Sequence, residues 1–173
     1  MIDLDFINKP VPPWLYYCSS EISIATDLSW KIAREHRHDL HVSLLRGNKM
    51  RNWQLLFNEI AATLQFPYYF GDNLNALDEC ITDLEWLNAQ GYLLVILGAD
   101  DILADCDEAD FKALMDHLIT AACVWAKPIR DGQTWDRDER PFHVLLHAEY
   151  RKEGVLRARL ERTGLDVPKT IIV

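Results

Sequence analysis

The sequence has few of the residues that mark fibrous, zinc-bound or disulfide-rich proteins. Its 173 residues include 7 glycines, 7 prolines and 4 cysteines, which excludes a collagen-like or low-complexity chain. The cysteines lie far apart without a C-x-x-C pair, so neither a zinc ribbon nor a disulfide framework is indicated. The apolar runs are strand-sized, far short of the roughly 20 residues that span a bilayer. We therefore expect no membrane segment and, because the acidic start of the chain is no signal peptide, a cytoplasmic protein.

The motifs of common enzymes are also missing. The sequence has no G-x-x-x-x-G-K-[ST], G-x-G-x-x-G or G-x-S-x-G pattern, so the glycine-rich phosphate cradles and the nucleophile elbow are absent. A faint calcium-loop pattern starts at Asp105, but Asp110 stands where that loop needs a glycine. His36, His38 and His41 lie at a loop-to-strand passage, where alternation sends neighbours to different faces. We expect no metal, no cofactor and no catalytic residue.

Positive charge is scarce in one part of the chain. The net charge is −9, which argues against binding nucleic acid through its phosphates, since that needs clustered Lys and Arg. Segment 68–111 carries eleven carboxylates and no Lys, Arg or His, leaving 16 acidic against 18 basic residues elsewhere. The eleven are Asp72, Asp78, Glu79, Asp83, Glu85, Asp100, Asp101, Asp105, Asp107, Glu108 and Asp110. Two interpretations stay open: a solvated acidic face, and an uncompensated surface that recognises a basic partner.

The hydrophobic pattern predicts a layered α/β domain. Apolar runs predict strands at 41–45, 92–97 and 142–147. The second run, YLLVIL, has no polar residue, which is typical of a strand covered on both faces. Helical periods predict helices at 50–65, from 73 to about 87, at 108–124 and at 155–162. The aromatic run 14–18 is also strand-like, and the tail 167–173 is a candidate edge strand. The alternation of strands and helices along the chain favours right-handed parallel crossovers.

The helix that begins near residue 73 has an unusual polar face. Four residues at spacings of four, three and four line up opposite its apolar stripe: Asn75, Glu79, Thr82 and Trp86. Three acids flank that row: Asp78, Asp83 and Glu85. An aromatic loop, 68–70, precedes the helix. Rigid rings beside a central acid are typical of a protein-binding hot spot, although we expect at least one of the three rings to pack inward.

Gly47 after the first strand, and the run 66–82, FPYYFGDNLNALDECIT, resemble the central signature of the barstar family, inhibitors of secreted or toxin-type ribonucleases. The resemblance implies a barstar-like layered α/β fold, with a small, mainly parallel three-stranded sheet flanked by helices, and no catalysis. On this basis we divide the chain into an N-terminal extension packed on the core (1–40), a barstar-like domain (41–147) and a C-terminal helix and tail (148–173).

The resemblance also implies a binding surface. The family's loop tyrosine, which covers the active-site mouth of the enzyme, falls on Tyr69, and its central helical acid, which enters the phosphate site, falls on Glu79. The expected partner contacts are Tyr69, Gly71, Asn73, Leu74, Asn75, Ala76, Asp78, Glu79, Thr82, Asp83 and Trp86. The chain departs from the family pattern at Asn75, Asp78 and Leu84, and it has no acid at 123–127. These departures favour another cognate nuclease, such as a toxin domain from a related bacterium, over barnase.

Three functions follow from these patterns. The leading one is a cytoplasmic ribonuclease inhibitor, or immunity protein of a toxin–antitoxin pair, that blocks a basic active site with an acidic helix and an aromatic loop. The second is an acidic interaction module for a basic partner that is not a nuclease. The third and least favoured is a metal-dependent hydrolase using Asp78, Glu79 and the histidines, because adjacent carboxylates on one helix point about 100° apart.

Overall fold

The computed structural model describes residues 5–165 and 169–171. Within them the chain forms one sheet of five strands in the order β2-β3-β4-β1-β5, and every neighbouring pair is parallel. The strands are β1 (Leu15–Ser19), β2 (His41–Arg46), β3 (Tyr92–Leu97), β4 (Phe142–Ala148) and β5 (Lys169–Ile171). The expected α/β fold with a parallel sheet is confirmed.

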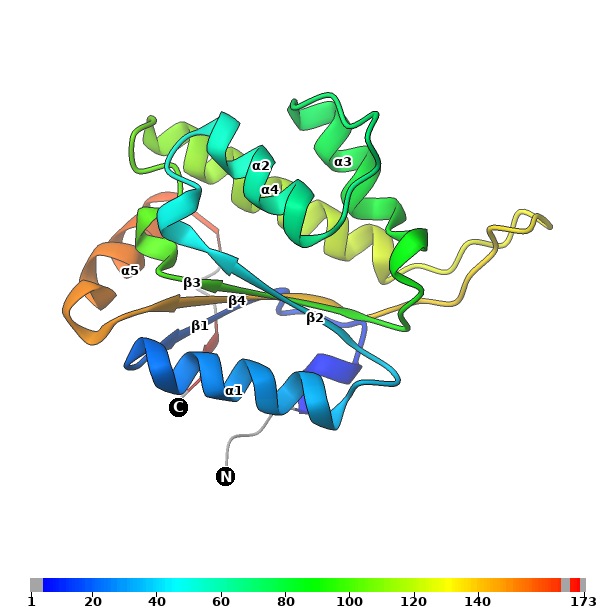
Figure 1. Cartoon of the computed structure of the whole chain (residues 1–173), viewed down its shortest axis with the longest axis horizontal. Coiled ribbons are helices and arrows are strands. Elements are labelled where there is room, and N and C mark those ends of the chain that lie inside the picture. The colour runs from blue at the N-terminus through cyan, green and yellow to red at the C-terminus, as the bar shows by residue number, and fades with distance from the viewer. Residues whose placement is uncertain (1–4, 166–168, 172–173) are drawn as a thin grey trace.

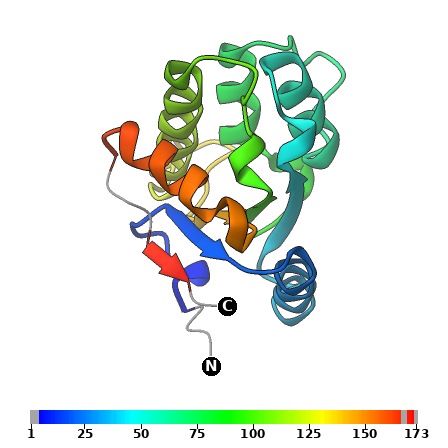
Figure 2. The ribbon, with the colours of Figure 1, turned by 90° about the vertical axis from the view of Figure 1, so that its left-hand side faces the viewer.

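Helices cover both faces of this sheet. The α-helices are α1 (Ile22–Glu35), α2 (Trp53–Thr63), α3 (Leu74–Asp83), α4 (Glu108–Trp125) and α5 (Glu153–Arg162). Short 3-10 helices are η1 (Asp5–Asn8), η2 (Gly47–Lys49), η3 (Glu85–Leu87), η4 (Ala99–Asp101) and η5 (Tyr150–Lys152). Figure 1 shows α2, α3 and α4 on one side of the sheet and α1 on the other, and Figure 2 shows the same layers from the side. Over the described part of the chain, no helix combines the length and apolar character needed to cross a membrane.

Two hydrophobic cores lie on opposite faces of the sheet, because successive residues of a strand point to opposite sides. Leu94 and Ile96 of β3 belong to the larger core, which includes residues of α2, α3, α4 and α5. Leu93 and Val95 belong to the smaller core, which α1 covers. All six residues of β3 are buried. The prediction of a strand covered on both faces is therefore confirmed.

The sheet has five strands, so the expected count of three was wrong. The three predicted strands are present, and β1 pairs with β4 along its whole length while β5 pairs with β1 at the edge. The strand-like run near the N-terminus thus belongs inside the sheet. Pairing between segments more than a hundred residues apart leaves no local sequence signal, which is why the apolar run alone did not place β1.

The N-terminal residues before α1 also pack on the sheet. The buried imidazole of His143 in β4 contacts the rings of Phe6, Trp14 and Tyr16, with centroids 5.5, 5.7 and 5.6 Å away. Its Nε2 lies 2.9 Å from the carbonyl oxygen of Lys9. Burial lowers the pKa of His143, because a charged ring is disfavoured away from water. The division of the chain at residues 40 and 147 stays a prediction.

Gly47, part of the family-like signature, lies where β2 and β3 end side by side. A Cβ atom at this position would lie 1.9 Å from the carbonyl oxygen of Gly98. No side chain fits so close an approach of two backbones. Gly47 therefore determines how the first strand passes into η2 and α2.

We expect Leu77→Ala to lower the free energy of unfolding by roughly 2 to 5 kcal/mol, since it opens a cavity in the larger core. Leu77 is fully buried on α3. Leu55→Ala on α2, at a side chain that is 42% exposed, is the matched control and should change the stability little. Urea denaturation of both variants measures this, and an unchanged midpoint for Leu77→Ala would contradict the assigned buried face of α3.

Candidate functional site

The loop before α3 is anchored by rings that point inward. Phe70 packs against Phe66 and Phe57, with ring centroids 5.0 and 5.9 Å apart. The neighbouring tyrosines face solvent, because Tyr68 is 100% and Tyr69 is 67% exposed. The expectation that at least one of the three rings packs inward is confirmed for Phe70. The anchored phenylalanines thus hold two tyrosines on a fixed piece of surface.

The turn from this loop into α3 depends on Asn73. Its side-chain oxygen accepts a hydrogen bond from the amide of Ala76 at 3.0 Å, and its side-chain nitrogen donates to the carbonyl of Gly71 at 2.9 Å. A Cβ atom on Gly71 would lie 2.9 Å from that same nitrogen. Both groups of the Asn73 amide are therefore engaged within the protein. Among the expected contact residues, Gly71 and Asn73 shape the surface by forming the helix cap.

The two sides of α3 differ sharply in character. Leu77, Cys80 and Ile81 are buried, and Leu74 and Ala76 are partly buried. Three residues at spacings of four point to solvent: Asn75, Glu79 and Asp83. This exposed row is the part of the predicted polar face that the structure brings together on the outside of α3.

Two further residues of the predicted face are turned toward other groups. Asp78 faces α4, where its Oδ1 lies 2.6 Å from Nδ1 of His117. Thr82 is half-buried, and its hydroxyl donates to the Asp78 carbonyl at 2.6 Å. The pair of acids at 78 and 79 is thus split, because Asp78 lies against α4 while Glu79 is exposed.

The predicted helix from 73 to about 87 was too long. α3 ends at Asp83, Leu84 takes a left-handed conformation with φ 46°, and η3 follows. Trp86 therefore does not continue the row of Asn75, Glu79 and Thr82. Its indole nitrogen instead donates to the carbonyl of Leu64 at 2.8 Å, and its ring packs on Phe66 at 6.0 Å. Trp86 thus packs against the inner side of the loop that carries Tyr68 and Tyr69, which we call the tyrosine loop.

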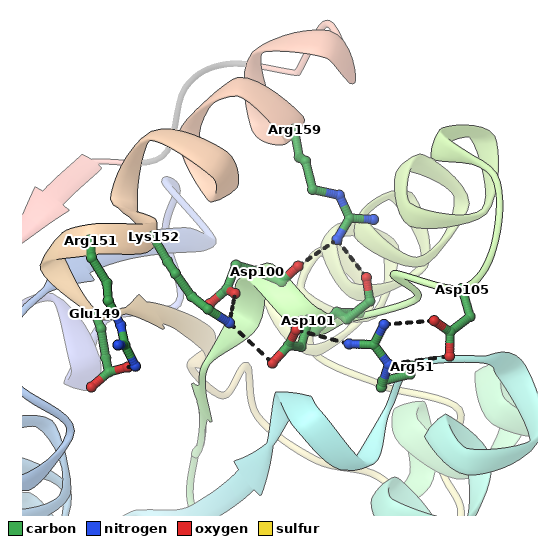
Figure 3. A network of polar contacts seen from close by, with 9 residues as sticks. Arg51, Asp100, Asp101, Asp105, Glu149, Arg151, Lys152 and Arg159 are labelled. Carbon is green, nitrogen blue, oxygen red and sulfur yellow. Dashed lines mark hydrogen bonds and ion pairs between the residues drawn. The ribbon is translucent and has the colours of Figure 1, made fainter.

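Many carboxylates of segment 68–111 are compensated by bases from outside it. Asp100, with a side chain 4% exposed, pairs with Lys152 at 2.6 Å, and Lys152 also reaches Asp101 at 3.4 Å. Arg51 binds Asp101 at 3.0 Å and Asp105 at 2.6 Å. Figure 3 shows this network joining η4, η5 and the start of α2. The expectation of a uniformly uncompensated segment was therefore wrong.

The acids at the start of α4 are also paired or take part in a helix cap. Glu108 pairs with Arg159 at 3.2 Å and Arg162 at 3.8 Å, and Asp107 and Asp110 form a capping box. Over residues 5–165 and 169–171, the acids of the segment without an ion pair or a place in that cap are Asp72, Glu79, Asp83 and Glu85. All four lie in or beside α3, so the unpaired carboxylates of this segment gather there.

The tyrosine loop and these acids form one continuous surface. Desolvation raises the pKa of Tyr69, and the nearby carboxylates of Asp83, Glu85 and Glu79 raise it further. Tyr69 and these three acids are all exposed. We call Tyr68, Tyr69 and the exposed residues of α3 and η3 the acidic face. Within the described ranges, no group of three or more His, Cys, Asp or Glu side chains is placed to hold a metal ion.

Comparison with solved structures shows a shared fold. The protein resembles two structures of the Aeropyrum pernix ORC2 protein, one in its ADP form, with 11% identity and a TM-score of 0.62, and one of its ADPNP–ADP complexes, with 13% and 0.54. The matches cover 95% and 92% of this chain but only 43% and 41% of those chains. The chain thus corresponds to less than half of the ORC2 protein, and at this identity the likeness concerns the fold alone.

Comparison of the sequence with known proteins and protein families shows to which family the chain belongs. None of the curated proteins with which the chain was compared matches it. The sequence model described as Barstar (barnase inhibitor) matches residues 40–147, which is more than half of the chain and includes the tyrosine loop, α3 and the three strands that the sequence predicted. The protein belongs to the barstar family.

Proposed function

We propose that the protein inhibits a ribonuclease by covering the basic active site of that enzyme with its acidic face. The observation that supports this most is the exposed Tyr69 near three acids, Glu79, Asp83 and Glu85, that have no basic partner within the described residues. A ribonuclease holds RNA phosphates with Lys, Arg and His side chains, and the same cations accept carboxylates. The protein then acts by occupying the site, and no chemical step is needed.

Glu79 is the central acid of this proposal. It is exposed on α3, with Asn75 one turn before it and Asp83 one turn after it. In contrast to Asp78, it has no side-chain partner among residues 5–165 and 169–171 that it would have to give up before it meets a cation. A carboxylate that pairs with an arginine inside a desolvated interface forms a strong, charge-assisted contact. Glu79 is therefore the residue proposed to enter the phosphate site, and Tyr69 the one proposed to cover its mouth.

The target is proposed to be a cognate bacterial nuclease or toxin nuclease domain, which would make the protein an intracellular immunity protein. The same acidic face also suits a basic protein that is not a nuclease, and this is the second candidate. One experiment separates the two candidates: the purified protein is mixed with barnase and with a panel of bacterial toxin nuclease domains, and cleavage of a fluorescent RNA is measured. Stoichiometric inhibition supports the first candidate. Capture of a basic protein without nuclease activity, and no inhibition, supports the second.

The likeness to nucleotide-containing structures does not lead us to propose nucleotide binding. Phosphate cradles use glycine-rich backbone before a helix N-terminus. Here β1 is joined to α1 by only Ser20 and Glu21, and Glu21 puts an exposed carboxylate at the start of α1. That negative charge would repel a phosphate at the helix N-terminus.

Glu79→Ala is expected to weaken binding of the inhibited ribonuclease by at least about 2 kcal/mol, because it leaves a cation of the enzyme unpaired in a desolvated contact. The figure of about 2 kcal/mol comes from measurements on known protein interfaces, including that of barnase with barstar. The melting temperature should hardly change, since the side chain is exposed. Titration calorimetry measures the affinity, and Glu35→Ala on α1, across the sheet, is the control. Equal affinities for both variants would remove α3 from the interface.

Association should be fast and sensitive to salt. If the unpaired acids steer the protein onto a basic cleft, the on-rate should approach about 10⁸ M⁻¹s⁻¹ at low salt and fall as ionic strength rises, with little change in dissociation. Asp72→Asn removes an exposed rim charge beside the helix cap and should lower the on-rate and flatten its salt dependence. Stopped-flow mixing over a salt series tests this, with Asp27→Asn on α1 as the control. An on-rate independent of salt would contradict electrostatic steering.

A further inference from the structure

A hairpin between α4 and β4 has no role in the function proposed so far. We call residues 127–140 the arm, and Figure 1 shows it projecting from the body of the protein beyond the end of α4. Its two sides pair through an antiparallel bridge between Ile129 and Arg137, with backbone hydrogen bonds of 2.9 and 3.2 Å. The arm is therefore a folded hairpin with a defined geometry.

The base of the arm is tied to the end of α4. The guanidinium of Arg137 lies 4.1 Å from the centre of the Trp125 ring. It also donates to the carbonyls of Val124, Trp125 and Lys127 at 3.2, 3.3 and 3.1 Å. Helix carbonyls carry partial negative charge, so the positive charge of Arg137 is satisfied within the protein.

The tip of the arm is held as well. The carboxylate of Asp136 accepts hydrogen bonds from the backbone amides of Asp131, Gly132 and Gln133 at 2.9, 2.9 and 3.3 Å. Arg130 and Asp138 form an ion pair across the hairpin. These contacts order the tip, although it lies away from the core. An element ordered in advance loses less conformational entropy when it binds a partner.

A pocket of about 510 Å³ lies between the arm and the end of α3. It is lined by Thr82, Asp83, Glu85 and Asn88 at the end of α3 and just after it, by Trp125 at the end of α4, and by six residues of the arm: Ile129, Thr134, Trp135, Asp136, Arg137 and Arg140. Thr82 and Asp83 are also expected partner contacts. The pocket is therefore continuous with the acidic face.

The pocket is lined by three carboxylates and by two guanidinium groups, those of Arg137 and Arg140, which both lie over the Trp125 ring. Its two free carboxylates suit a further guanidinium group. Asp83 and Glu85 are exposed and have no ion pair over the described ranges, whereas the carboxylate of Asp136 is occupied by backbone amides. Trp135, which also lines the pocket, is 59% exposed, and a tryptophan face attracts a cation. Arginine stacks on an aromatic ring and binds carboxylates with its planar fork, which lysine does not do equally well.

We propose that this pocket receives an arginine side chain of the ribonuclease, from outside the active site of the enzyme, and that the arm is a second contact that selects among nucleases. This inference rests on the proposed function. The guanidinium stacks on Trp135 and faces the carboxylates of Asp83 and Glu85. The pocket then recognises a surface feature that differs among enzymes with the same catalytic cations.

The pocket is tested first without any nuclease. N-acetyl-arginine amide is titrated into the ¹⁵N-labelled full-length protein, and the indole N–H signal of Trp135 is followed by NMR, with neutral N-acetyl-glutamine amide as the comparison probe. We expect a saturable shift with the arginine probe alone. Asp83→Asn/Glu85→Gln should weaken the response at least fivefold, whereas Asp27→Asn/Glu35→Gln, which removes the same charge from α1, should retain it. No saturable shift, or equal shifts with both probes, overturns the proposal.

The role in target selection is tested by inhibition of barnase and of the same panel of toxin nuclease domains. Trp135→Ala should raise the inhibition constant at least tenfold, while Trp30→Ala, at an equally exposed tryptophan on α1, should not change it. If Glu79→Ala abolishes inhibition and Trp135→Ala does not alter it, the inference about the arm is wrong and the proposed function stands. If the unmodified protein inhibits no nuclease, the proposed function fails and selection by the arm fails with it, whereas the arginine titration still decides what the pocket binds.

Discussion

The burial of β3 on both faces is the constraint from which the layers of this protein follow. A strand with six buried apolar residues needs a helical layer on each side, and α1 supplies one while α2, α3 and α4 supply the other. The orientation of α3 is then fixed by Leu77 and Ile81, which lie in the larger core. Turning Glu79 inward would bury a charge without a partner, which is strongly unfavourable. The acidic face is thus a consequence of how the core is filled.

A second consequence concerns where negative charge remains. The carboxylate of Asp100 is almost fully buried, and a buried charge must be paired. Lys152 and Arg51 lie close enough to neutralise the acids around η4. These bases come from segments far from the acids in sequence, so the run of carboxylates alone gave too simple a picture. With that end of the protein compensated, the free carboxylates near α3 mark the surface that is proposed to meet a cationic partner.

The sequence predicted which helices and strands are present better than it predicted where they end and which strands pair. The apolar pattern located three strands and the long helices because burial follows periodicity directly. It also continued through Leu84 and Leu87, beyond the real end of α3, since both side chains still lie on the core side after the left-handed turn. Periodicity reports which side chains are buried and does not report the backbone hydrogen bonds. The place of β1 and the fold of the arm depend on contacts distant in sequence, such as Arg137 on Trp125, which no local pattern contains.

The family signature itself divides into two kinds of residue. Gly47, Gly71 and Asn73 shape the backbone, because a Cβ atom would clash at each glycine and the asparagine caps α3. Tyr69 and Glu79 are exposed, and they are the residues proposed to contact a partner. A match to such a signature therefore says more about the shape of a binding surface than about its target. Under the proposed function, the choice of target depends on exposed groups that can vary without disturbing that shape, such as the free acids along α3 and Trp135 in the arm.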